Sequence, residues 1–169
     1  MKNRRYHIIL IFTLSVILLT VPFASRSFSQ EKETPAKESK EDMGGHILGF
    51  SYRGDVRRIR IYIKAGATLN ERDTTNKTPL INAGLYGHTE VAKMLIEAGA
   101  DINAQEDNGK TALIMAAWWN NPKVAELLIN ANADLSLKDA AGMTALDRAK
   151  KKNNKPIIKM LEEAMARPE

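Results

Sequence analysis

The sequence contains no cysteine among its 169 residues. This absence excludes disulfide bonds, a thiolate nucleophile and any metal site built on cysteine ligands. Histidine is also scarce, and only His46 and His88 lie beyond the first 29 residues. Neither is paired in the sequence with a nucleophile or a further ligand, and the acidic residues recur at no spacing typical of a carboxylate pair. We therefore expect no catalytic activity, no bound metal and no cofactor.

The first 29 residues have the three zones of a secretory signal peptide. A basic start is followed by an apolar run over residues 8–21 and then by small polar residues. The run is shorter than the roughly 20 residues that a helix needs to cross a bilayer. We predict a signal peptide over residues 1–29, with cleavage before Gln30 and cleavage after Ser27 as second choice. The alternative is an uncleaved anchor that holds a scaffold at a membrane.

Excess charge of one sign disappears once this segment is removed. The whole chain has a net charge of +5, but four of its 25 basic residues lie in residues 1–29, which contain no acidic residue. The rest has 21 basic and 20 acidic residues. One cationic cluster remains, formed by Arg148, Lys150, Lys151, Lys152 and Lys155. We interpret it as a solvated terminal face, so no nucleic-acid partner is expected.

Residues 30–42 contain no large apolar side chain and are predicted to be a disordered polar linker. Beyond the linker, the same residue types recur every 33 positions. The repeated positions include Thr78, Thr111 and Thr144; Leu80, Leu113 and Leu146; Ala83, Ala116 and Ala149; Leu95, Leu128 and Leu161. A fixed period of this length is typical of a solenoid in which each unit is one supersecondary element. Four windows share the pattern: 43–72, 73–105, 106–138 and 139–166.

Each window predicts two helices. Thr78 can cap a first helix over residues 79–86, and Gly87 then turns the chain into a second helix that ends near Ala98. Gly66, Gly99 and Asn132 occupy the same place after the second helix, where a left-handed backbone favours Gly and then Asn. Residues 58–64 alternate like a strand, but the repeat register places them under helical segments, and we follow the register.

The residues DTTNKTPLINAGLYGHTEVAKMLIEAGADIN, at 73–103, resemble an ankyrin repeat, and the resemblance extends over residues 43–166. It implies an all-α solenoid of about four repeats with β-hairpin finger loops, a concave groove lined by the first helices, and a protein-binding role. The His that usually follows Thr-Pro-Leu is replaced by Ile81, Ile114 and Asp147. We expect stability to depend more on apolar packing, with degenerate first and last repeats acting as caps.

Two sets of positions vary freely in the family pattern and form the predicted binding surface. The first set points into the groove and comprises Tyr52, Arg53, Leu85, Tyr86, Trp118, Trp119, Lys151 and Lys152. The second lies at the finger tips and comprises Thr74, Thr75, Lys77, Asp107, Asn108, Lys110, Ala140, Ala141 and Met143. Because adjacent helical residues diverge by about 100°, we expect at least one of the two tryptophans to be exposed.

The predicted function is a monomeric protein-binding module in the periplasm or outside the cell, which does not insert into the membrane after cleavage. Aromatic residues along successive repeats would form a continuous strip, and large aromatics are enriched in binding hot spots. The alternatives are an inhibitor or protective partner of one exported enzyme, and a binder of small ligands or nucleic acid that uses the basic last repeat.

Overall fold

The structure is a computed structural model that describes residues 40–167, with side chains described from residue 47. The predicted signal peptide and residues 30–39 of the predicted linker lie outside the described residues. The described part contains eight helices and no strand. The helices are α2 (Lys40–Arg53), α3 (Val56–Lys64), α4 (Pro79–Tyr86), α5 (Thr89–Glu97), α6 (Ala112–Trp119), α7 (Pro122–Asn130), α8 (Ala145–Lys151) and α9 (Lys155–Met165). Helix α2 thus begins three residues before the predicted repeat boundary.

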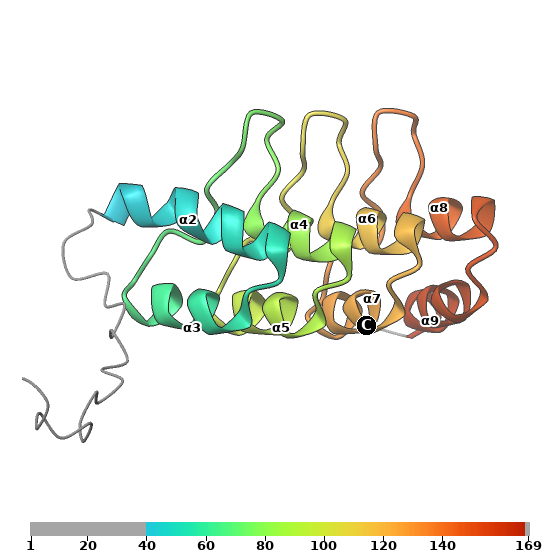
Figure 1. Cartoon of the computed structure of the whole chain (residues 1–169). Coiled ribbons are helices and arrows are strands. Elements are labelled where there is room, and N and C mark those ends of the chain that lie inside the picture. The colour runs from blue at the N-terminus through green and yellow to red at the C-terminus, as the bar shows by residue number, and fades with distance from the viewer. Residues whose placement is uncertain (1–39, 168–169) are drawn as a thin grey trace, which may run out of the picture. The chain divides into compact units, whose positions relative to one another are not determined.

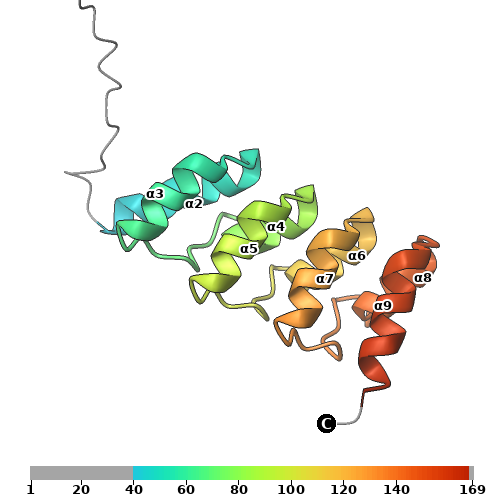
Figure 2. The ribbon, with the colours of Figure 1, turned by 90° about the horizontal axis from the view of Figure 1, so that it is seen from below.

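The helices are arranged as four pairs in two layers (Figure 1). The first helices of the pairs, α2, α4, α6 and α8, pack against one another in one layer, and α3, α5, α7 and α9 form the other. Seen from below, the pairs follow one another in chain order (Figure 2). Long loops between the pairs extend away from both layers. We call α2, α4, α6 and α8 the inner helices, and α3, α5, α7 and α9 the outer helices.

The inner helices begin where the sequence predicts. The Thr78 hydroxyl accepts a hydrogen bond from the Ile81 N–H at 3.3 Å, and Thr111 caps α6 in the same way through Ile114 at 3.2 Å. Such a cap satisfies an N–H that the helix itself cannot pair. Ile81 and Ile114, which replace the usual His, are buried. Apolar packing therefore occupies the place of that side chain in both central pairs.

The segment of residues 58–64 is helical, as its repeat register predicts and its alternation does not. It forms the greater part of α3, which Asp55 caps through the Arg58 N–H at 3.0 Å. Ile59 is buried, and Tyr62 and Ile63 pack on the same core at the three- and four-residue spacing of a helix face. In so short a segment, apolar residues that recur at helix spacing can also alternate with polar residues, so the alternation does not distinguish a strand from a helix.

Left-handed residues end the helices at the predicted positions. Gly87 closes α4 with φ 73°, and Gly66, Gly99 and Asn132 follow α3, α5 and α7 with φ values of 77°, 88° and 59°. Asn120 ends α6 with φ 57°, in the place of Gly87. A positive φ is accessible to Gly without strain and next most readily to Asn.

The three finger loops, residues 73–77, 106–110 and 139–143, have closed turns at their tips. In the first, the Asp73 N–H donates to the Lys77 carbonyl at 3.1 Å, and Glu106–Lys110 and Asp139–Met143 repeat this bond at 3.1 and 3.0 Å. The predicted β-hairpins are not confirmed, because no strand forms within residues 40–167. Hydrogen bonds between neighbouring finger loops hold the loops together instead.

Candidate interaction surface

Hydrogen bonds between successive repeats fix the ends of α2, α4 and α6. Asn121 Nδ2 donates to the carbonyls of Gly84 at 2.9 Å and Leu85 at 3.2 Å, and Asn154 Nδ2 donates to Ala117 at 2.6 Å. His88 Nε2 lies 3.1 Å from the Tyr52 carbonyl. These three donors are spaced by 33 residues, and this spacing is the signal by which the sequence could have identified them. Because they pair the last carbonyls of the preceding inner helix, they fix the backbone that carries the aromatic residues at those helix ends.

Tyr52 and Tyr86, the tyrosine pair, lie at the ends of α2 and α4. Their ring centroids are 4.7 Å apart at an interplanar angle of 72°, an edge-to-face arrangement. Partial burial raises the pKa of Tyr86 above its ordinary value, and a hydrogen bond with the Tyr52 side chain raises it further. Both rings remain accessible, with Tyr52 55% and Tyr86 45% exposed. The predicted neighbours differ, since Arg53 is exposed whereas Leu85 is half-buried against the core.

Trp118 and Trp119, the tryptophan pair, have different environments. Trp118 is half-buried, with the Arg148 guanidinium carbon 4.8 Å and the Lys152 ammonium nitrogen 4.2 Å from its ring centroid. Trp119 is 57% exposed. The expectation that at least one tryptophan is accessible is therefore confirmed, and Trp119 is that residue. Trp118 instead joins α6 to the last helix pair through two cation–π contacts.

The aromatic residues do not form one continuous strip. Among the described residues, no ring-to-ring contact joins Tyr86 to either tryptophan. The strip therefore consists of two separate pairs, and this part of the expectation is wrong. Ring contact requires side chains of suitable length on both neighbouring repeats. At the register of Tyr52 and Trp118, α4 carries the aliphatic Leu85.

The finger tips support one another through main-chain and side-chain bonds. Asn76 Nδ2 donates to Asp107 at 2.6 Å, the Asp107 N–H donates to Thr75 at 3.2 Å, and the Ala140 N–H donates to Asn108 at 2.8 Å. Of the predicted tip residues, the exposed ones are Thr74, Thr75, Asp107, Asn108, Ala140 and Ala141, and the half-buried ones are Lys77, Lys110 and Met143. The tips therefore present exposed side chains on loops that are tied together.

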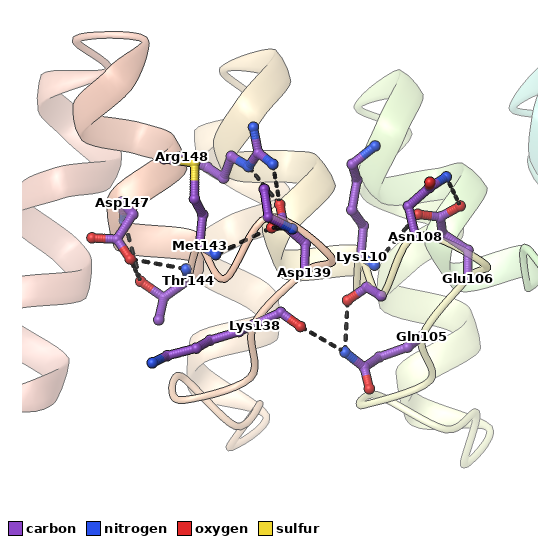
Figure 3. Close-up of polar contacts among 12 residues, drawn as sticks. Gln105, Glu106, Asn108, Lys110, Lys138, Asp139, Met143, Thr144, Asp147 and Arg148 are labelled. Atoms are coloured by element: carbon purple, nitrogen blue, oxygen red, sulfur yellow. Dashed lines mark hydrogen bonds and ion pairs between the residues drawn. The ribbon is translucent and has the colours of Figure 1, made fainter.

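Asp139 connects the third finger loop to Arg148 of α8 (Figure 3). Its Oδ1 accepts from the N–H groups of Ala141 at 2.9 Å and Met143 at 3.1 Å, and its Oδ2 accepts from Arg148 Nε at 2.5 Å. Arg148 in turn stacks on Trp118. Burial alone would raise the pKa of Asp139, but these hydrogen bonds and the Arg148 charge outweigh burial and hold the pKa below its ordinary value. The sequence analysis placed Arg148 in a solvated cluster, whereas its side chain is only 12% exposed.

In the part of the chain that the structure describes, no group of three or more His, Asp and Glu side chains could hold a metal ion. Within residues 40–167, no helix has both the length and the apolar composition needed to cross a bilayer.

Comparison with known proteins identifies the architecture. Residues 49–139 match the family model for ankyrin repeats, in three copies. A search of the curated proteins finds no match. The matched region covers more than half of the 169 residues and includes the tyrosine pair, the tryptophan pair and the first two finger loops. The chain belongs to the ankyrin-repeat family.

Proposed function

We propose that this chain is an exported, non-catalytic protein-binding domain whose binding surface comprises the aromatic ends of the inner helices and the finger loops. Ankyrin repeats are generally protein-interaction modules and are generally not catalytic. The proposed export rests on the three zones of residues 1–29. We expect the protein recovered from its host to begin at Gln30, which N-terminal sequencing would test. A chain that still begins at Met1 would favour the anchored alternative.

The observation that carries the proposal is the exposure of Trp119 at the end of a fixed helix. Trp119 is 57% exposed, so a partner that covers it removes a large apolar area from water. Binding hot spots are enriched in Trp, Tyr and Arg. The Trp119 backbone belongs to α6, whose end is held by the Asn154 bond to Ala117, so little order has to be gained on binding.

A photo-crosslinking experiment tests this surface. A photoreactive phenylalanine analogue placed at Trp119 should crosslink a partner, while the same analogue at Met165 should not. Met165 is the matched control because it is an equally exposed large apolar residue, at 58%, in the last turn of α9.

The partner so identified should bind the Trp119→Ala variant at least about tenfold more weakly than the wild type, which corresponds to about 1.4 kcal/mol. Calorimetric titration would measure the two affinities. The Met165→Ala variant should bind like the wild type. Equal affinities for the wild type and the Trp119→Ala variant would refute a role for this surface.

A further inference from the structure

We infer that the segment bound at the tryptophan pair is an acidic peptide segment of the partner protein, with an aromatic or aliphatic side chain among its carboxylates. This inference rests on the proposed function and specifies the chemistry of the partner. It is carried by the cations at the ends of α2 and α8 that have no ion pair among the described residues, together with the place of Lys152 beside the tryptophan pair.

Exposed cations flank the uncharged central helices. Helices α4 and α6 contain no charged residue at all, whereas α2 ends at Arg53, and α8 ends at Lys151 and is followed by Lys152. All three of these cations are exposed. In the described part of the chain they form no ion pair, whereas the neighbouring Lys150 is paired with Glu162 at 2.9 Å.

The carboxylates of α8 and of the finger loops are already engaged in hydrogen bonds. Asp147, the acidic residue of α8, accepts from the N–H of Thr144 at 2.9 Å and from its hydroxyl at 2.8 Å in a capping box. In the finger loops, Asp73 and Asp139 accept from N–H groups of their own turns, and Asp107 accepts from the neighbouring finger. These hydrogen bonds hold each carboxylate within its turn, its cap or its contact with the next finger.

Lys152 places an ammonium group directly beside the aromatic rings. Its Nζ lies 4.2 Å from the Trp118 ring centroid, and Trp119 is the next residue along α6. Arg148 also contacts the Trp118 ring, but its charge is neutralised by Asp139. The charge of Lys152 has no such partner among the described residues. A carboxylate that pairs with Lys152 would bring the adjacent side chain of its peptide onto the exposed Trp119 ring.

A single-stranded nucleic acid is the main competing ligand, since it also combines base stacking on aromatics with cationic contacts. Such binding needs a positively charged track that follows the phosphates. Helices α4 and α6 supply no cation between Arg53 and Lys151. Among the described residues, the unpaired cations nearest the tryptophan pair, Lys151 and Lys152, are therefore confined to one end of the uncharged helices, which suits a short acidic peptide segment better.

The test uses a random copolymer of glutamate and tyrosine as the probe and the full-length chain as the protein. Quenching of tryptophan fluorescence should report binding of this copolymer, and the binding should weaken as salt is raised because the lysines are exposed. A lysine–tyrosine copolymer should not bind. Polyglutamate lacks an aromatic side chain that could contact Trp119, and single-stranded DNA lacks a peptide backbone. Both should bind at least about tenfold more weakly than the copolymer.

Matched charge reversals locate the contact. The Lys151→Glu/Lys152→Glu variant should bind the glutamate–tyrosine copolymer at least about tenfold more weakly. The Lys123→Glu/Lys155→Glu variant changes the net charge equally at exposed positions of the outer helices and should bind like the wild type. Circular dichroism would check that both variants fold, and the milder Lys151→Gln/Lys152→Gln variant should show the same trend.

Three results would overturn the inference. One is equal binding of the copolymer by both reversal variants. Another is equal or tighter binding of DNA or polyglutamate by the wild type. The third is failure of the copolymer to bind while the crosslinked partner still depends on Trp119, which would leave the proposed function intact. Loss of that Trp119 dependence would instead refute the proposed function.

Discussion

Replacing Asp139 with alanine should lower the free energy of unfolding by about 3–5 kcal/mol, because it breaks a buried ion pair by removing one partner. The Asp139 side chain is 1% exposed, and that of Arg148 is 12% exposed. Without the carboxylate, the Arg148 charge stays largely buried and keeps only its contact with Trp118. Two N–H groups, of Ala141 and Met143, lose their acceptor as well. Urea denaturation followed by circular dichroism would measure the change.

Asp73 provides the matched control for this substitution. It occupies the corresponding place in the first finger loop and accepts from the N–H groups of Thr75 at 2.8 Å and Lys77 at 2.9 Å. The residue nine positions after Asp139 is Arg148, whereas the residue nine positions after Asp73 is the uncharged Asn82. Asp73→Ala should therefore cost only about 1–2 kcal/mol, for the lost turn bonds alone. Equal losses for the two variants would show that the ion pair contributes nothing beyond the turn.

The same carboxylate gives the stability a dependence on pH. Because the pKa of Asp139 is lowered in the folded state, its contribution is fully present above the unfolded pKa of about 3.9 and is lost as the pH falls through the folded pKa. The wild type should therefore lose more stability than Asp139→Asn between about pH 5 and pH 2. Parallel pH profiles for the two proteins would contradict this assignment.

The sequence was sufficient for features that each repeat specifies by itself. Thr78 and Gly87 mark the two ends of α4 because capping and a left-handed backbone depend on local geometry. The repeat register also predicted correctly that residues 58–64 are helical despite their strand-like alternation, because the 33-residue register carries information from the other units. Contacts of this local kind are readable from one repeat and its copies.

Features that depend on the next repeat could not be read in this way. Trp118 and Trp119 are neighbours in sequence, but Arg148 and Lys152 cover only the first, and they belong to the following helix pair. Which tryptophan stays accessible is thus decided by side chains about 30 positions away. The division of the aromatic strip into two pairs has the same origin, since every ring contact across repeats requires a matching side chain on each.

The close approach of α4 and α6 leads to the second large effect. A Cβ atom added at Gly84 would lie 2.5 Å from the Ala112 carbonyl oxygen and 3.1 Å from two further backbone atoms of Ala112. Because backbone cannot rotate aside as a flexible side chain does, Gly84→Ala must push the two inner helices apart. We expect a loss of about 2–3 kcal/mol in the free energy of unfolding, net of the gain in helix propensity.

The same substitution at Gly49 should have the opposite effect on stability. It lies within α2, and a Cβ atom there would meet nothing within 4 Å. Gly49→Ala should therefore stabilise the protein by about 0.5–1 kcal/mol through the lower entropy of the unfolded chain. Urea denaturation of the two variants side by side measures both signs. If Gly84→Ala also stabilised the protein, α4 and α6 would have to be farther apart than this structure places them, and the stacking of the repeats beneath the aromatic residues would be looser.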